Sequence, residues 1–133
     1  MDVLVVENDV SLLSYIIELI QGWGYHAERS ETGQDTLKKV NKRKFDLVLL
    51  DTSLPDMRAQ DLIKRLKELQ AEIRIVTMTE SNTKGLEDEI RTLGIIFYMS
   101  KPISENVLKE ILDHISIRKR KETKGSTLKK SKE

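Results

Sequence analysis

The sequence lacks cysteine altogether, and this absence excludes two kinds of protein. Without cysteine, the chain can form neither a disulfide framework nor a thiolate zinc site. Histidine is nearly as scarce, and His26 and His114 are too few and too scattered for a metal cluster. No apolar run approaches the roughly 20 residues of a membrane span, and no basic N-terminal segment leads into an apolar one as in a signal peptide. We therefore expect a cytoplasmic protein with no membrane partner.

Positive charge is concentrated at the C-terminus. Although the net charge is only +1, residues 118–133 hold eight Lys and Arg against Glu122 and Glu133, and the remaining residues sum to −5. The basic segment has one large aliphatic residue, Leu128, and cannot bury enough surface to offset the entropy of ordering. We predict a single domain over residues 1–117, followed by a basic, disordered tail or linker stub. The acidic domain argues against direct nucleic-acid binding.

Strand and helix signals alternate along the chain. Five segments, most of them apolar, predict β-strands at residues 3–6, 25–30, 45–50, 73–79 and 95–99. Apolar residues at helical spacing predict a helix after each strand, within residues 10–20, 32–44, 62–69, 86–93 and 107–115. Five β-α units in a row predict an α/β protein with a parallel sheet and helices on both faces.

Polar residues stand where four of the predicted strands end. Glu7 and Asn8 follow the first strand, Asp51 follows the third, Thr79 ends the fourth, and Lys101 lies just beyond the fifth. Because the carboxyl ends of parallel strands meet at one edge of the sheet, these residues are expected to line one crevice. Carboxylate and amide oxygens are ligands that Mg²⁺ takes, and a carboxylate can accept a phosphoryl group. A lysine and a hydroxyl nearby can bind the oxygens of the transferred group.

In these positions the sequence resembles the receiver domain of two-component response regulators. The resemblance covers about residues 1–117 and is carried by four motifs, "VVEN" (5–8), "LLDTSLPDM" (49–57), "MT" (78–79) and "YMSKP" (98–102). It implies a flavodoxin-like, doubly wound (βα)5 fold whose five-stranded parallel sheet has the strand order 2-1-3-4-5. It also implies a phosphoprotein of phosphorelay signal transduction, a switch rather than a turnover enzyme.

The resemblance assigns the phosphoryl and metal chemistry to particular residues. Asp51 would form an aspartyl phosphate, taking the phosphoryl group from a phosphohistidine on a sensor histidine kinase or a phosphotransfer protein. Mg²⁺ would be held by Glu7, Asn8, Asp51 and the backbone carbonyl of Ser53. Lys101 would contact a phosphoryl oxygen, and the bond from this lysine to the following proline is often cis in the family.

The resemblance also implies how phosphorylation is passed on to partners. Thr79 would bind the phosphoryl group and shift inward, and Tyr98 would follow it. The added charge would thereby bias a two-state domain. The surface that changes would be formed by the fourth helix, fifth strand and fifth helix, about residues 83–117. Its partner would be a downstream protein effector or an output domain.

One departure from the family pattern concerns the metal site. Asn8 stands where the family normally has Asp, so the site loses one negative charge. A unit charge at about 4 Å is worth roughly 4 kcal/mol at an effective dielectric constant of about 20, less the repulsion that its loss relieves. We therefore predict weakened, but not abolished, Mg²⁺ binding. Asp9 could replace the missing acid, but its position favours capping the helix that follows.

Other departures affect the surroundings of the site. Glu80 follows Thr79, where the family prefers a small residue, and its carboxylate could repel an incoming phosphoryl group or point into water. Ala59 replaces a common glycine after the acceptor loop. Ile96 and Phe97 replace acidic residues, which argues against the charged dimer interface of one large subgroup. They could form an exposed patch for another partner or pack beneath the fourth helix.

Three functions are alternatives to a phosphorylated switch. A degenerate receiver would bind partners without phosphorylation, and Asn8 with Glu80 favours this alternative. An aspartyl-phosphate hydrolase needs a second acid two residues after the nucleophile, where this chain has Ser53. A DNA-binding protein acting through its tail would need a recognition module with its own core, for which the tail is too short.

Overall fold

A computed structural model describes the backbone of residues 1–81 and 83–132, and the side chains of these residues up to Glu122. The chain divides into two compact units, Met1–Ile103 and Ser104–Glu133. Within the described part, no helix is both long enough and apolar enough to cross a membrane.

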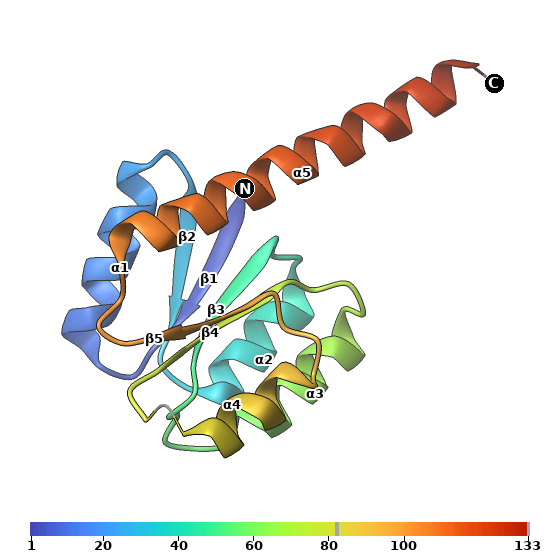
Figure 1. Cartoon of the computed structure of the whole chain (residues 1–133). Coiled ribbons are helices and arrows are strands. Elements are labelled where there is room, and N and C mark those ends of the chain that lie inside the picture. The colour runs from blue at the N-terminus through green and yellow to red at the C-terminus, as the bar shows by residue number, and fades with distance from the viewer. Residues whose placement is uncertain (82, 133) are drawn as a thin grey trace. The chain divides into compact units, whose positions relative to one another are not determined.

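The first unit is built on a five-stranded parallel sheet with the order β2-β1-β3-β4-β5 (Figure 1). This order and the parallel pairing confirm the flavodoxin-like fold. The strands are β1 (Asp2–Val6), β2 (His26–Ser30), β3 (Leu47–Asp51), β4 (Ile75–Thr79) and β5 (Phe97–Ser100). The last four begin one or two residues later than predicted. For β3 and β4 the reason is that Phe45 and Ile73 are buried ahead of the strands and pair with no neighbour in the sheet.

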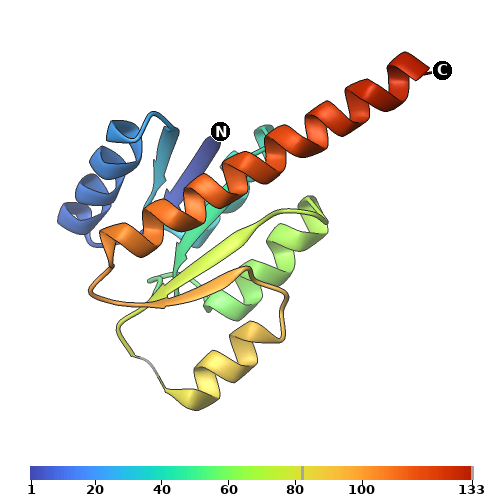
Figure 2. The same cartoon turned by 45° about the horizontal axis from the view of Figure 1, so that its top comes forward.

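Four helices of this unit cover the two faces of the sheet. α1 (Val10–Gly22) lies on one face, and α2 (Gly33–Lys42), α3 (Ala59–Leu69) and α4 (Lys84–Arg91) lie on the other (Figures 1 and 2). Thr32 caps α2 as predicted, since its side chain accepts a hydrogen bond from the amide of Asp35. Thr83 caps α4 in the same way.

The strands supply the core because side chains alternate between the faces. Every residue from Val3 to Val6 and from Leu47 to Leu50 is buried, as expected for central parallel strands covered on both sides. On the face covered by three helices, strand residues pack with residues of α2, α3 and α4, among them Leu4, Val48, Leu50, Val40, Leu62, Leu66 and Ile90. This packing places the carboxyl ends of β1, β3 and β4 at one edge of the sheet.

The second unit contains α5 (Glu105–Lys132). The backbone is therefore helical across most of the segment predicted as a disordered tail, which agrees with the strong helix propensity of its many Lys, Arg and Glu residues. The side chains of residues 123–132, and residue 133 entirely, lie outside the described part of the structure. A domain boundary at residue 117 stays a prediction.

Candidate phosphoacceptor and metal site

The fold brings three of the predicted site residues into direct contact. The Lys101 ammonium nitrogen lies 3.1 Å from Oε1 and 3.0 Å from Oε2 of Glu7. It also lies 3.5 Å from Oδ1 of Asp51. Both acids are almost completely buried, with 1% of Glu7 and 2% of Asp51 exposed. One ammonium group therefore compensates two buried carboxylates that come from different strands.

Burial and charge shift the pKa values of two of these groups. Burial raises the pKa of Glu7, and the neighbouring Asp51 raises it further, while the hydrogen bond from Lys101 opposes both effects. Burial alone would lower the pKa of Lys101, but its hydrogen bond to Glu7 and the charges of Asp51, Glu7 and Glu80 together raise it. Lys101 is therefore positively charged at neutral pH.

The acceptor loop and β4 complete the site. The backbone amide of Ser53 donates a 3.1 Å hydrogen bond to Oδ1 of Asp51, which orients the carboxylate. Thr79 is fully buried, and its hydroxyl donates to the carbonyl of Ser81 at 3.2 Å. The amide of Lys101 donates to the carbonyl of Thr79 at 2.7 Å, which joins the segment carrying the lysine to the end of β4. The Lys101–Pro102 peptide bond is cis.

Asn8 and Glu80 are exposed at the rim of this site. The charge of Glu80 is among those that raise the pKa of Lys101, so it contributes to the electrostatics of the site from solvent. Asp9 is the N-cap of α1, and its carboxylate accepts a 3.2 Å hydrogen bond from the amide of Leu12. This contact confirms the capping role that its position favoured.

Asp9→Ala is expected to lower the free energy of unfolding by about 1 kcal/mol, because one amide of the first turn of α1 loses its acceptor. Asp61→Ala is the matched control, since Asp61 lies in the first turn of α3 without capping it and pairs with Arg58 in solvent. Urea denaturation without Mg²⁺ measures the free energy of unfolding of both variants. An unchanged stability together with weakened Mg²⁺ binding would instead identify Asp9 as a metal ligand.

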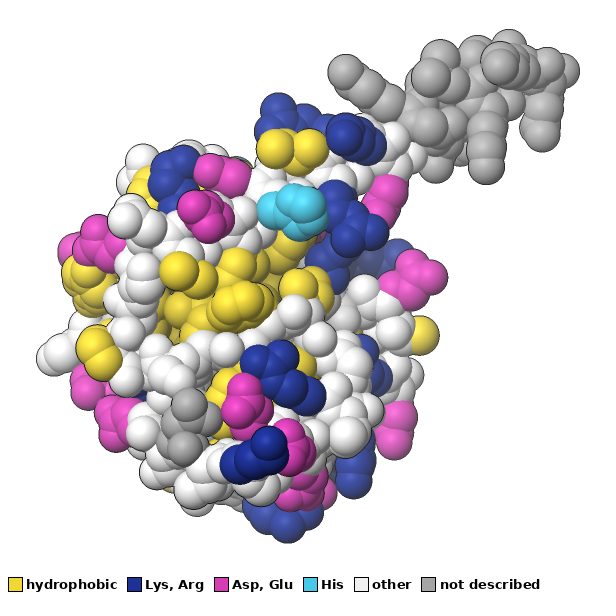
Figure 3. All heavy atoms as spheres, viewed as in Figure 1, with side chains coloured by type: hydrophobic (Ala, Val, Ile, Leu, Met, Phe, Trp, Pro, Cys, Tyr) yellow, Lys and Arg dark blue, Asp and Glu magenta, His cyan; other side chains and the backbone are white. Residues whose placement is uncertain are grey.

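The predicted switch residue Tyr98 differs in exposure from Ile96 and Phe97, the residues of the possible partner surface. Tyr98 is buried in the core beneath the guanidinium of Arg91, which lies 5.6 Å from the centre of its ring, and its hydroxyl has no hydrogen-bond partner. Ile96 and Phe97 are 47% and 41% exposed, so they do not pack beneath α4. Figure 3 shows hydrophobic side chains exposed among charged ones on the face that is turned to the viewer in Figure 1. The structure therefore favours the exposed patch of the two predicted alternatives.

The donor set fits a small, hard cation. Oxygen atoms of two buried carboxylates already surround one positive charge, that of Lys101, and Mg²⁺ favours such ligands. Among the described residues, no group of three or more acidic, histidine or cysteine side chains could hold a metal ion. Of the predicted ligands, Asn8 could add only the neutral oxygen of an amide to the two carboxylates.

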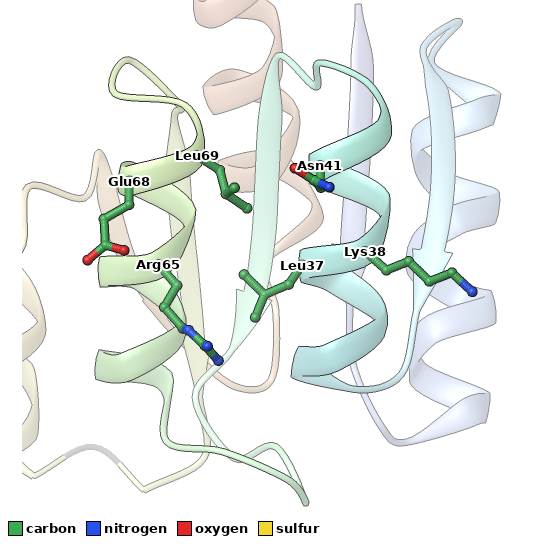
Figure 4. Close-up of a pocket in the computed structure, with 6 residues that line it drawn as sticks. All are labelled: Leu37, Lys38, Asn41, Arg65, Glu68 and Leu69. Atoms are coloured by element: carbon green, nitrogen blue, oxygen red, sulfur yellow. The ribbon is translucent and has the colours of Figure 1, made fainter.

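One cavity of the described part lies away from these residues. A cavity of about 500 Å³ lies between α2 and α3 (Figure 4), lined by Leu37, Lys38, Asn41, Arg65, Glu68 and Leu69. In Figure 4, Leu37 and Arg65 point toward one another across it, while Lys38 and Glu68 point away. The cavity shares no residue with the cluster of Glu7, Asp51 and Lys101.

One contact of the acceptor loop was missed in the sequence. The carboxylate of Asp56 accepts hydrogen bonds from the amides of Gly33 and Gln34, both at 2.9 Å, at the start of α2. The sequence predicts only Thr32 as a cap for this helix. An acid in a loop carries no local signal of the distant helix that it will contact, so sequence spacing could not have revealed the pairing.

Comparison with known proteins places this geometry in a family. A family model described as "Response regulator receiver domain" matches residues 3–113. The transcriptional regulatory protein ZraR of Salmonella typhimurium is 34% identical over 112 residues, which cover 84% of this chain and 25% of ZraR. The chain thus spans about a quarter of that relative's length.

Two further relatives match over most of their own length. The sporulation initiation phosphotransferase F of Bacillus subtilis is 27% identical, with 81% of this chain and 87% of the relative covered. A CheY-like receiver domain protein of Methanospirillum hungatei has a crystal structure with a TM-score of 0.82. At 22% identity, that match covers 90% of this chain and 97% of the other.

Proposed function

Because the chain belongs to the response regulator receiver domain family, we propose that it accepts a phosphoryl group on Asp51 from a phosphohistidine. The donor would be a sensor histidine kinase or a phosphotransfer protein. The observation that carries this proposal is the ammonium of Lys101 between the buried carboxylates of Glu7 and Asp51.

The geometry supports nucleophilic attack by Asp51. The ammonium of Lys101 lies 3.5 Å from Oδ1 of Asp51, and the amide of Ser53 donates a hydrogen bond to the same oxygen. An Asp51 oxygen forms the new O–P bond while the P–N bond to the donor imidazole breaks, and the electron pair of that bond leaves with the imidazole. Lys101 then compensates the charge of the phosphoryl oxygens, and the hydroxyl of Thr79 can exchange its bond to Ser81 for one to the phosphoryl group.

Mg²⁺ would be held by Glu7, Asn8, Asp51 and the carbonyl of Ser53. When bound, it would neutralise negative charge on the phosphoryl oxygens during transfer. Since Lys101 already pairs with Glu7, the two cations compete for the same carboxylate. The neutral Asn8 amide further lowers the attraction of the site for the metal.

The proposed output is a change in a protein-binding surface rather than substrate turnover. The exposed Ile96 and Phe97 adjoin the buried Tyr98 in the chain, so a movement of the tyrosine would reach the patch directly. The partner would be a downstream protein effector or an output domain, and the proposed compartment is the cytoplasm.

Intact-mass spectrometry after incubation with acetyl phosphate and Mg²⁺ tests the proposed chemistry. Wild type is expected to gain the mass of one phosphoryl group, and Asp51→Ala is expected to gain none. A wild type that stays unmodified with this donor and with a phosphorylated histidine donor would overturn the proposal. Modification of Asp51→Ala to the same extent would show that another residue is the acceptor.

A further inference from the structure

The loop after Asp51 is attached to α2 as well as to its own strand. Oδ1 and Oδ2 of Asp56 each accept one 2.9 Å hydrogen bond, from the amides of Gly33 and Gln34, and these residues lie 23 and 22 positions away in the sequence. The next two amides of α2 bond to Thr32. Asp56 therefore completes the capping of α2 from a distant loop, through bonds that a charged acceptor makes stronger than neutral ones.

A second contact brings the same loop against the same helix. Gly33 is buried, and a methyl group at this position would lie 2.5 Å from both Cγ and Sδ of Met57. Gly33 does not have the positive φ found at Gly24 and Gly94. Its backbone conformation is therefore open to alanine, and the side chain of Met57 is what a methyl group at this position would meet.

The backbone of the loop links these contacts with α2 to Asp51. Ser53 and Arg58 form an antiparallel backbone bridge that closes the loop around residues 54–57. The amide of Ser53 in turn bonds to Oδ1 of Asp51. A displacement of Asp56 or Met57 from α2 would therefore move the segment that orients the acceptor carboxylate.

We propose that the contacts of Asp56 and Met57 with the start of α2 position the acceptor loop for Mg²⁺ binding, and that Asp56 is a positioning residue. This inference rests on the proposed function, since it concerns the Mg²⁺ site at Asp51. In the described part of the chain, no hydrogen bond or ion pair joins either residue to Glu7, Asp51 or Lys101, so the effect would be transmitted through the backbone of the loop.

The test compares two disruptive variants with two matched controls. Asp56→Ala removes the carboxylate from α2, and Gly33→Ala places a methyl group against the side chain of Met57. Asp35→Ala removes another acid from the first turn of α2, which pairs with Lys39 and also hydrogen-bonds to Ser30. Gly85→Ala adds a methyl group in α4 where no atom lies within 4 Å.

Mg²⁺ binding to each full-length variant is measured by calorimetry, alongside thermal unfolding and the phosphorylation rate at saturating Mg²⁺. Both disruptive variants are expected to raise the Mg²⁺ dissociation constant about tenfold, the lower end of the range for groups that orient metal ligands. The two controls are expected to bind Mg²⁺ as wild type does. A role limited to stability would lower the melting temperature and leave the dissociation constant unchanged, which overturns the proposal.

A rescue separates displacement of the loop from general damage. Met57→Ala removes the atoms with which a methyl group at position 33 collides. The double variant with Gly33→Ala is therefore expected to bind Mg²⁺ as tightly as Met57→Ala alone, a non-additive result. Purely additive losses would contradict the steric argument. If Asp56→Ala does not fold, Asp56→Asn, which keeps one acceptor oxygen, takes its place.

The results also separate this inference from the proposed function. If wild type binds Mg²⁺ but never gains a phosphoryl group, the proposed function is overturned. The Mg²⁺ dissociation constants of the variants still test whether Asp56 is a positioning residue. A wild type that is phosphorylated, with unchanged Mg²⁺ binding in Asp56→Ala and Gly33→Ala, overturns the inference alone.

Discussion

Lys101→Met is expected to lower the free energy of unfolding by about 3 kcal/mol at pH 7 without Mg²⁺, because removing one partner of a buried ion pair leaves a buried charge uncompensated. Here the carboxylates of Glu7 and Asp51 lose their only close cation among the described residues. Both oxygens of Glu7 lie near the ammonium nitrogen of Lys101, and Oδ1 of Asp51 lies 3.5 Å from it. Lys109→Met is the control, since Lys109 pairs with Asp113 at a surface position, where such pairs contribute at most about 1 kcal/mol.

The effect of Lys101→Met should depend on pH. The folded-state pKa of Glu7 is raised above its ordinary value of 4.5, mainly by burial. The stability that protonated Glu7 contributes is therefore present below the unfolded pKa and lost as pH rises through the folded pKa. Without the hydrogen bond from Lys101, which lowers this pKa, the folded pKa rises further. The stability difference from wild type should therefore grow as pH increases from about 4.5 toward neutrality.

Mg²⁺ should reverse much of this loss, since a ligand that binds only the folded state stabilises it. Urea denaturation of both proteins at pH 5 and pH 7, with and without Mg²⁺, measures these effects. We expect a larger stabilisation by Mg²⁺ in Lys101→Met than in wild type, because the competing ammonium is gone. Equal stabilisation of the two proteins would show that Lys101 and Mg²⁺ do not compete for Glu7.

Asn8→Asp is expected to lower the Mg²⁺ dissociation constant by about 10- to 100-fold. The added charge is worth at most roughly 4 kcal/mol of attraction at about 4 Å, and repulsion from Glu7 and Asp51 offsets part of it. The same repulsion should destabilise the metal-free protein modestly. Calorimetric titration with Mg²⁺ measures the affinity, and a titration repeated at high salt tests the electrostatic origin of the gain.

The control for this substitution is Asn41→Asp, which adds the same charge at an exposed position of α2 away from the site. It should leave Mg²⁺ affinity unchanged. If Asn8→Asp also binds Mg²⁺ as wild type does, position 8 is not a ligand in this chain, and the predicted weakening of the metal site would be wrong.

Much of the fold could be predicted because it depends on local patterns. The apolar runs at residues 3–6 and 45–50 indicate strands buried on both faces, and the structure places them at the centre of the sheet. Thr32 and Asp9 precede helices and cap them. Strand order is not such a local property, and its prediction depended on the family resemblance.

The site could be predicted in part, for a topological reason. Residues that follow parallel strands converge at one edge, so Glu7 and Lys101 form an ion pair although they lie 94 positions apart. This reasoning identifies which side chains meet. It does not say that Lys101 contacts Glu7 at 3.0 Å and Asp51 only at 3.5 Å, because such differences depend on packing.

The sequence by itself determined the alternation of strands and helices, the caps of α1 and α2, and the residues gathered beyond the strand ends. These features depend on periodicity and chain direction, which can be read from neighbouring residues. Only the tertiary structure decided the exposure of Ile96 and Phe97, the burial of Tyr98, and the attachment of Asp56 to α2. Each of these depends on which distant surface a residue meets, and that follows from the packing of the whole unit rather than from neighbouring residues.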